Sequence, residues 1–447
     1  MRRWTPNCRQ VLNSRAPRVG RAHGSPRLLH SSVQLSVAAA KTPARPDPFT
    51  FLTPHLPEFR EGLLELLGSG HPGLSDIARY YFLRPSKYLR PLLVFLFSHA
   101  TNGLGNQWSL KEWEARGGGE GSMENLNRSI SPADVLNDWN PIIPQHSAPF
   151  DPIFNTNLAR PHHAPLEPPN DLPTLAQLTA LPTILPTQMR LAHILEMIHA
   201  ASLLHDDVID ASPLRRGVAS APEAFGNKLA VLGGNFVLGR ASAALARLGD
   251  LDVVELIASI ISNLVEGEIL QLKDLGGPAQ DPADAWNLYL QKTYMKTASL
   301  MAKGARAAVA LGGCAEGEIW REVAYAYGRN LGIAFQLQDD ILDYEVSDAT
   351  LGKPGGADLQ LGLATGPALY AMEEYPEMGP LIARKFENEG DVELARDLVK
   401  RSSGVERTRE LALAYARAAR DVLQPLPESD AKEALAALTE RVVKRTH

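Results

Sequence analysis

Two aspartate-rich motifs restrict what this chain of 447 residues can fold into more than any other feature. Each motif reads Asp-Asp-x-x-Asp at the end of an apolar stretch with helical spacing. Residues four apart share one face of a helix, so each motif projects carboxylates from one patch. Unpaired carboxylates that face a protein interior are strongly disfavoured, which predicts a bound cation between the motifs. The six acids are Asp206, Asp207, Asp210, Asp339, Asp340 and Asp343.

The residue types in these motifs select the kind of cation. Every candidate ligand is a carboxylate, and the chain holds only two cysteines, Cys8 and Cys314, which are too few for a structural zinc site. Magnesium prefers a few carboxylates completed by waters and substrate phosphates. We therefore expect magnesium ions that bridge a diphosphate to the protein. A solvated helix end is the alternative explanation for one such motif, and the second copy argues against it.

Helical spacing of apolar residues recurs along most of the chain and predicts an all-α protein. The spacing is present within 54–100 and returns at Pro186, a favoured first-turn residue. The strict alternation typical of β-strands is absent, and no apolar run reaches the eighteen residues expected of a membrane span. We therefore expect one large helical domain over 47–447. Its later amphipathic segments cover about 227–248, 253–275, 284–312 and 317–344.

The first 46 residues differ from the rest, because they hold nine Lys and Arg residues and no acid. This composition is typical of a transit peptide and predicts a mitochondrial location, in the matrix or at the matrix face of the inner membrane. A basic arm that binds nucleic acid or anionic lipid is the alternative. Subtracting these nine charges from the net charge of −6 leaves the remaining chain near −15, which argues against nucleic acid as a partner. Peripheral membrane association remains compatible with the sequence.

Residues 101–181 interrupt the helical pattern. They contain a glycine-rich run at 117–121 and ten prolines between 132 and 173. Such a composition buries too little apolar surface to order itself, so we expect a flexible, disordered insert. A small second domain is the alternative.

These motifs resemble those of the trans-isoprenyl diphosphate synthase family, over nearly the whole chain apart from the insert. The family fold implied by the resemblance is a helical bundle of the isoprenoid synthase type with a central cavity. Besides the acidic motifs, the similarity is carried by Lys87-x-x-Arg90-Pro91, Glu196-Met-Ile-His199, Phe225-Gly-Asn-Lys228, Glu266-Gly-Glu268, Lys296-Thr297, Gly352-Lys353-Pro354 and Gly404-Val-Glu-Arg-Thr408.

The resemblance also implies a reaction, the magnesium-dependent condensation of isopentenyl diphosphate with an allylic diphosphate. The residues implied to hold isopentenyl diphosphate are Lys87, Arg90, His199 and Arg216. Those implied to hold the allylic diphosphate are Arg215, Lys296, Thr297, Gln336 and Lys353. Direct catalytic roles are expected for Asp206, Asp210, Arg215, Lys296 and Lys353.

The residues four and five positions before Asp206 bear on product length. They lie about 6 to 7.5 Å along the helix from it, on the face that bears the acids. They are Ser202 and Ala201, both small, and within the resembled family small residues here accompany longer products. Close helix packing is the alternative reason for their size. With the transit-like segment, the resemblance implies a long-chain polyprenyl diphosphate synthase for the ubiquinone side chain. One departure from the family is Asn235, where many relatives have an acid.

Two other functions fit parts of this pattern. A non-catalytic subunit of a hetero-oligomeric synthase would share the fold, but both aspartate motifs are intact here. A terpene cyclase would ionise the same substrates, but it would need neither a second basic diphosphate pocket nor a second Asp-Asp-x-x-Asp. A homodimer is the expected assembly, with a hetero-oligomer as the alternative.

Overall fold

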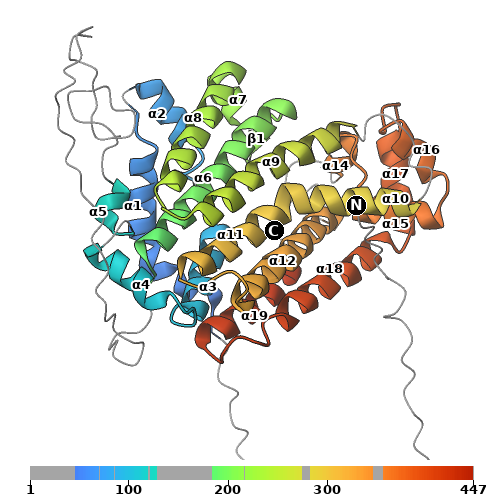
Figure 1. Ribbon diagram of the computed structural model, residues 1–447. Coiled ribbons are helices and arrows are strands. Elements are labelled where there is room, and N and C mark those ends of the chain that lie inside the picture. Colours follow the sequence, from blue (N-terminus) through green and yellow to red (C-terminus); the bar gives the residue numbers. More distant parts are fainter. Residues whose placement is uncertain are drawn as a thin grey trace, which may run out of the picture. The chain divides into compact units, whose positions relative to one another are not determined.

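The structure is a computed structural model that describes residues 46–69, 71–84, 86–118, 121–127, 184–215, 217–273, 282–345 and 356–445. Within these ranges the chain is helical apart from one short hairpin, so the all-α prediction is confirmed (Figure 1). Contacts divide the chain into residues 1–44 and 45–447, and every element named below belongs to the second unit. The predicted transit peptide therefore lies almost wholly outside the described residues.

The elements between Pro48 and Asn127 have at most thirteen residues each. They are η1 (Pro48–Phe51), η2 (Thr53–His55), α1 (Leu56–Leu66), α2 (Pro72–Arg79), α3 (Leu89–Thr101), α4 (Trp108–Trp113), the π-helical turn η3 (Glu114–Gly118) and α5 (Met123–Asn127).

Longer helices and the hairpin form the middle of the chain. They are α6 (Pro186–Ile209), β1 (Leu214–Arg215), β2 (Val218–Ala219), α7 (Ala221–Phe225), α8 (Asn227–Ala246), α9 (Leu251–Lys273), α10 (Pro282–Thr293), the π-helical turn η5 (Tyr294–Ala298), α11 (Ser299–Leu311) and α12 (Ile319–Glu345). The C-terminal part contains α14 (Ala357–Gln360), α15 (Gly366–Glu374), α16 (Met378–Ala383), α17 (Asp391–Arg401), α18 (Gly404–Asp421) and α19 (Asp430–Lys444).

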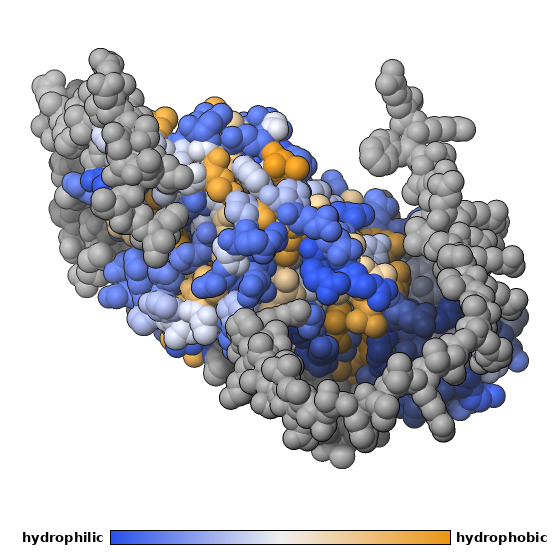
Figure 2. Space-filling view, turned by 90° about the horizontal axis from the view of Figure 1, so that it is seen from below, coloured by the Kyte–Doolittle hydropathy of each residue, from blue (hydrophilic) through white to orange (hydrophobic). Residues whose placement is uncertain are grey.

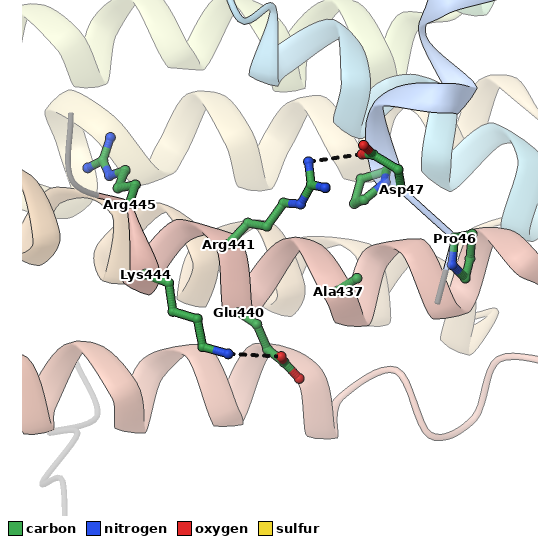
Figure 3. Close-up of a pocket in the computed structure, with 8 residues that line it drawn as sticks. Pro46, Asp47, Ala437, Glu440, Arg441, Lys444 and Arg445 are labelled. Carbon is green, nitrogen blue, oxygen red and sulfur yellow. Dashed lines mark hydrogen bonds and ion pairs between the residues drawn. The ribbon is translucent and has the colours of Figure 1, made fainter. Parts of the chain in front are cut away.

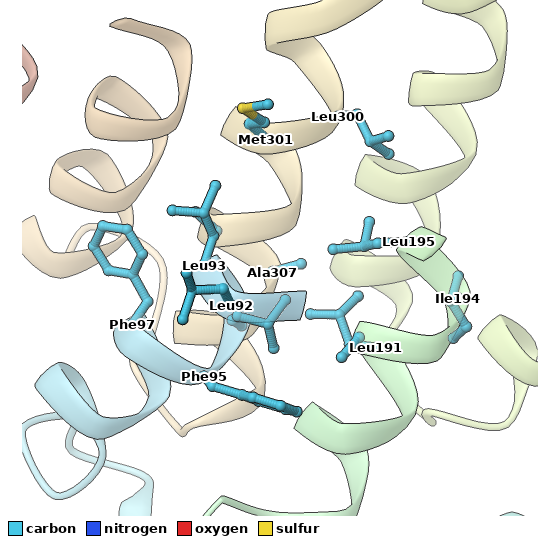
Figure 4. Close-up of a cluster of buried hydrophobic side chains, with 14 of the residues drawn as sticks. Leu92, Leu93, Phe95, Phe97, Leu191, Ile194, Leu195, Leu300, Met301 and Ala307 are labelled. Carbon is cyan, nitrogen blue, oxygen red and sulfur yellow. The ribbon is translucent and has the colours of Figure 1, made fainter. Parts of the chain in front are cut away.

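Helix α6 carries the first motif and runs through the core. Pro186 occupies its first turn, where a missing backbone N–H costs nothing, and Gln188 accepts a 3.0 Å hydrogen bond from the backbone N–H of Leu185. Its apolar residues pack against α3, α8 and α11. Figure 4 shows this core, where Leu191 and Leu195 of α6 meet side chains from α3 and α11. The buried body of α6 therefore fixes where its last turn lies.

Helix α12 carries the second motif and approaches its neighbours closely at two glycines. A Cβ at Gly328 would lie 2.6 Å from the carbonyl oxygen of Met301, and one at Gly332 would lie 2.5 Å from Cα of Ala298. Only glycine permits this approach, which brings α12 against α11 and η5. On another side Tyr327 donates a 2.7 Å hydrogen bond to the carbonyl of Leu435 in α19. The close approach at Gly332 therefore holds α12 beside η5, and the Tyr327 bond holds it against α19.

The structure corrects the predicted insert at its start. Residues 101–118 and 121–127 belong to the helical body, with Trp108 and Leu126 buried, so the prediction of a disordered insert is wrong for them. Arg247 also donates a 3.0 Å hydrogen bond to the carbonyl of Asn125. The physical reason is visible in the sequence, since 101–127 contains no proline and carries several large apolar residues. Residues 128–183 lie outside the described part of the chain.

Helix α8 is the one helix among the described residues that is long and apolar enough, by length and composition, to cross a membrane. It packs along α6 and also contacts α2 and α7, with Ala230, Val237 and Ala241 buried. These contacts account for part of its apolar character. Figure 2 shows one face of the molecule, where hydrophilic residues surround smaller apolar patches.

Candidate active site

The first motif occupies the last turn of α6, where Asp206 and Asp210 lie within electrostatic reach of Glu268 in α9 and Lys296 in η5. Lys296 in η5 donates to Glu268 of α9 at 2.5 Å and to Gln271 at 3.0 Å. Burial raises the pKa of Asp206 to about 6, and the nearby Lys296 opposes this shift. Burial likewise raises the pKa of Asp210. Among the described residues, neither of these two carboxylates forms a hydrogen bond or an ion pair, so both are available to a ligand.

Asp207 points to a different side of α6, because consecutive helical residues are about 100° apart. It is completely buried, and its Oδ1 accepts from Nε and a terminal nitrogen of Arg215 at 2.7 and 2.6 Å. Its Oδ2 accepts a short hydrogen bond from the hydroxyl of Tyr81. That hydroxyl accepts a 2.9 Å bond from the backbone N–H of Ala221. The middle aspartate of the first motif therefore anchors Arg215 on the hairpin.

In the second motif the middle aspartate is also buried and held. Asp340 accepts from the hydroxyl of Tyr289 in a short hydrogen bond and from Nε2 of Gln336 at 2.9 Å. Burial raises the pKa of Asp340 to about 6, although these two donors oppose the shift. Thr297 donates to Oε1 of Gln336 at 2.8 Å, which joins η5 to α12. The donors to Asp340 are thus neutral groups, whereas Asp207 is paired with the cation Arg215.

The outer aspartates of the second motif have partners of their own. Asp339 forms a 2.6 Å ion pair with Arg445, whose guanidinium also lies over the ring of Phe335. Burial raises the pKa of Asp339, and Arg445, Lys87 and Arg90 all oppose that shift. The two cations at the start of α3, predicted from the sequence to hold isopentenyl diphosphate, therefore lie within electrostatic reach of the second motif.

Asp343 and Asp358 complete the acidic group at the end of α12. Asp343 accepts from the backbone N–H groups of Ala357 and Asp358 at 3.0 and 3.1 Å. Burial and the three aspartates of the second motif raise the pKa of Asp358 well above its ordinary value. The sequence did not predict Asp358, because a single acid after a glycine-rich loop has no motif of its own. Nor did it predict Tyr81 and Tyr289, because single tyrosines far from the aspartates in the chain carry no motif either.

The π-helical turn η5 joins the two motifs. Its consecutive residues Lys296 and Thr297 face different partners, Glu268 near the first motif and Gln336 beside the second. A π-turn inserts one extra residue into a helix and is frequent at functional sites, because it redirects side chains. The close approach at Gly332 keeps α12 against this turn. The two motifs are therefore neighbours across η5.

The donor set fits a hard divalent ion that keeps other ligands. Across the described residues, no three Asp, Glu, His or Cys side chains converge closely enough to form a complete metal site. Asp206 and Asp210 offer carboxylate oxygens from one helix face, with Lys296 nearby to receive a polyanion. Magnesium bound through one or two carboxylates plus phosphates and waters suits this arrangement. The contacts of Asp207 and Asp340 favour positioning roles, so metal ligation by these two residues stays a prediction.

The remaining predicted site residues are placed as follows. Ala201 is buried in the core, and the hydroxyl of the half-buried Ser202 donates to the carbonyl of His199 at 2.9 Å. His199 itself lies about two turns before Asp206 on α6. Arg216 and Lys353 lie outside the described residues, so their roles stay predictions.

A pocket of about 360 Å³ lies between Pro46–Pro48 and the end of α19, and none of these aspartates lines it. Figure 3 shows its charged residues, with Arg441 paired to Asp47 and Lys444 paired to Glu440. Arg445 lines the same pocket, while its guanidinium reaches Asp339. Because these charges pair with one another, the pocket has no set of cations directed at a diphosphate.

The chain is similar to known proteins along most of its length. Residues 174–399 match the model of the polyprenyl synthetase family. A mitochondrial protein of Neurospora crassa named as a probable hexaprenyl pyrophosphate synthase is 44% identical, over 89% of this chain and 82% of its own length. The mitochondrial hexaprenyl pyrophosphate synthase of Saccharomyces cerevisiae is 37% identical, over 89% of this chain and 90% of its own.

Among solved structures, a polyprenyl synthase from Caulobacter crescentus complexed with calcium and isoprenyl diphosphate has a TM-score of 0.64. It is 25% identical, and the match covers 90% of this chain and 97% of that one. The family model spans half of this chain, and both curated relatives align along most of their length, so the chain belongs to the polyprenyl synthetase family.

Proposed function

We propose that this protein is a long-chain trans-polyprenyl diphosphate synthase, which condenses isopentenyl diphosphate with an allylic diphosphate and requires magnesium. The observation that carries the proposal is the meeting of two aspartate motifs across η5. Lys296 lies on the first-motif side, and Lys87 and Arg90 lie near Asp339 of the second. Two basic regions beside one acidic centre provide for two diphosphates.

Different residues have different roles in the proposed reaction. Bound magnesium would supply Lewis-acid stabilisation of the departing diphosphate. Lys296 and Arg215 hold the allylic diphosphate while its bond to the allylic carbon breaks, and they stabilise the charge that develops. Lys87 and Arg90 orient isopentenyl diphosphate, so that its double bond attacks the same carbon. The released diphosphate takes the final proton. The buried core below Asp206 excludes water, which would otherwise quench the cation.

The length of the product follows from the residues below the first motif. Ala201 is completely buried among side chains of the core cluster that α3, α6 and α11 share. A small residue here does not itself block a chain that grows along α6, so we propose a long-chain product. The two curated relatives are named hexaprenyl synthases, which supports that length. The ubiquinone side chain is the proposed destination.

The same relatives are named mitochondrial, which supports the address predicted from residues 1–46. We propose a location in the mitochondrial matrix, because an arginine-rich, acid-free N-terminal segment is typical of mitochondrial import. Association with the inner membrane is part of this proposal, because a long prenyl product is strongly apolar.

The proposed assembly is a homodimer through α8 and α9. These two helices contact each other and expose large apolar side chains, which a second copy would cover. A hetero-oligomer is the alternative, and a relative from Schizosaccharomyces pombe, 38% identical, is named decaprenyl-diphosphate synthase subunit 1. Light scattering of the wild type and of Leu232→Asp would separate these states. The exposed apolar residues are Leu229, Val231, Leu232, Leu251, Val265, Ile269 and Leu272.

Product analysis tests the function directly. The purified protein is incubated with radiolabelled isopentenyl diphosphate, an allylic primer and magnesium, and the extracted products are dephosphorylated and chromatographed. We expect prenyl alcohols longer than geranylgeraniol, and none when the metal is chelated. Hydrocarbon products would indicate a cyclase instead. Absence of turnover until a partner protein is added would indicate a non-catalytic subunit.

A further inference from the structure

Two adjacent tyrosines after α2 contact the segment that follows the first motif, but only one of them reaches an aspartate. The hydroxyl of Tyr80 donates to the carbonyl of Ala219 at 3.0 Å. The hydroxyl of Tyr81 accepts from the N–H of Ala221 at 2.9 Å and donates to Oδ2 of Asp207. The chain therefore offers a pair of neighbouring phenols with similar surroundings and different partners.

The Tyr81 hydroxyl completes the hydrogen bonding of a buried charge. Asp207 is inaccessible to solvent, and both nitrogens of Arg215 that contact it bind the same oxygen, Oδ1. Tyr81 is the partner of the other oxygen, Oδ2. Without that donor, the carboxylate would carry an unsatisfied buried oxygen and could rotate about its last torsion. The direction of the Arg215 guanidinium depends on that rotation.

Tyr81 also connects two parts of the active site that are distant in sequence. It lies six residues before Lys87, on the connection that leads into α3, and 126 residues before Asp207. Arg215 follows on β1, after the end of α6. One hydroxyl thereby ties the segment bearing Lys87 and Arg90 to the anchor of Arg215.

We propose that Tyr81 is a positioning residue for the allylic diphosphate, acting through Asp207 to aim the guanidinium of Arg215 at that ligand. The inference rests on the proposed function and adds a residue to it. Tyr81 does not touch the diphosphate itself. Its loss should therefore weaken binding of the allylic substrate selectively, and the loss should vanish when Arg215 is absent.

The first experiment compares Tyr81→Phe with the matched control Tyr80→Phe. We expect Tyr81→Phe to raise KM for the allylic diphosphate about tenfold, as expected for one hydrogen bond to a charged group, with a much smaller change in KM for isopentenyl diphosphate. Tyr80→Phe should leave both values near those of the wild type. Equal effects of the two variants, or equal effects on both substrates, would assign Tyr81 a merely structural role.

The second experiment is a double-mutant cycle that needs no turnover. Calorimetry measures binding of inorganic diphosphate, with magnesium present, to the wild type, Tyr81→Phe, Arg215→Gln and the double variant. We expect Tyr81→Phe to weaken binding about tenfold in the wild-type background and to have no effect in the Arg215→Gln background, because coupled residues are not additive. Additive losses would overturn the inference.

Two further controls keep these tests decisive. Thermal unfolding checks that each variant is folded, and if Tyr81→Phe does not fold, Tyr81→Leu replaces it in the same cycle, because leucine also lacks the hydroxyl that bonds Asp207. A wild type that binds diphosphate but forms no prenyl product would refute the proposed function while leaving the cycle interpretable. The two hypotheses therefore fail on different observations.

Discussion

Helices α6 and α12 end in the same motif, yet the two motifs have different electrostatic surroundings. In both, the middle aspartate is buried and receives a tyrosine hydroxyl, from Tyr81 for Asp207 and from Tyr289 for Asp340. The other side-chain donor is the cation Arg215 in the first motif and the neutral amide of Gln336 in the second. The same spacing of aspartates can therefore anchor either a charged residue or an uncharged network.

The outer aspartates differ as well. In α6, Asp206 and Asp210 have no hydrogen bonds among the described residues, while in α12 Asp339 pairs with Arg445 and Asp343 accepts two backbone N–H groups. Carboxylates without partners are the ones that a metal-bound diphosphate can reach at least cost. We therefore propose that the first motif is the principal binding site for the metal.

The largest expected effect is the loss of an open carboxylate. Asp206→Asn should lower kcat on the order of a hundred- to a thousandfold, because it removes charge that stabilises the leaving group through the metal. Asp343→Asn should lower kcat less, because Asp343 already accepts two backbone N–H groups. Steady-state kinetics over a range of magnesium concentrations measures both. A greater loss for Asp343→Asn would reverse the proposed ranking of the motifs.

The two middle aspartates provide the next test, on stability. Asp207→Asn leaves Arg215 without its buried partner and should cost about 3 kcal/mol of unfolding free energy. Asp340→Asn should cost under about 1 kcal/mol, because neutral donors surround this carboxyl and burial, which raises the pKa of Asp340, penalises the charge that the substitution removes. Urea unfolding at neutral pH compares them. Similar losses would show that the surroundings of the two motifs are energetically equivalent.

The same substitution in the turn before each motif should affect product length differently. Ala201→Phe, five positions before Asp206, should shorten the product to the farnesyl or geranylgeranyl range and reduce longer products about a hundredfold, which corresponds to about 2.7 kcal/mol. Ala334→Phe lies at the matching position before Asp339 and should overpack a buried site without changing product length. Chromatography of the products checks both. An unchanged product ladder for Ala201→Phe would favour helix packing as the reason for the small residue.

The smallest effect concerns how α6 is held at its buried end. His193 stacks on Phe59 and hydrogen-bonds its carbonyl at 2.9 Å, and burial lowers the pKa of His193 to about 3. The unfolded chain binds the proton more readily, so this contribution to stability is complete above about pH 6.5 and falls as the pH drops toward 3. At pH 5.5 the loss should be about 1.4 kcal/mol.

Urea unfolding of the wild type and of His193→Phe between pH 5.5 and 7.5 measures this contribution. The wild type should lose more stability on acidification than the variant, while other histidines affect both proteins alike. Helix α12 is held by Tyr327 instead, whose hydroxyl stays protonated across this range because burial raises the pKa of Tyr327 further. Tyr327→Phe should therefore leave the pH dependence unchanged. Equal slopes for the wild type and His193→Phe would contradict the assignment.

Much of the site was predictable because its signals are local. The all-α body and the two acidic faces follow from apolar and acidic residues three and four apart, a periodicity that one helix encodes by itself. Lys296, Thr297 and Gln336 came from short motifs, and the structure brings them together. The predicted start of the insert at 101 was wrong, because the composition was averaged over 101–181. The first part of that range contains no proline and is helical in the structure.

The sequence by itself determined the helices, the placement of the aspartates on them and the resemblance to a family, because each depends on residues close together in the chain. Only the tertiary structure decided which carboxylates remain open and which act as anchors. That choice depends on partners such as Tyr81, 126 residues from Asp207, and Tyr289, 51 residues from Asp340. Such contacts arise from helix packing, for which a motif of five residues contains no information.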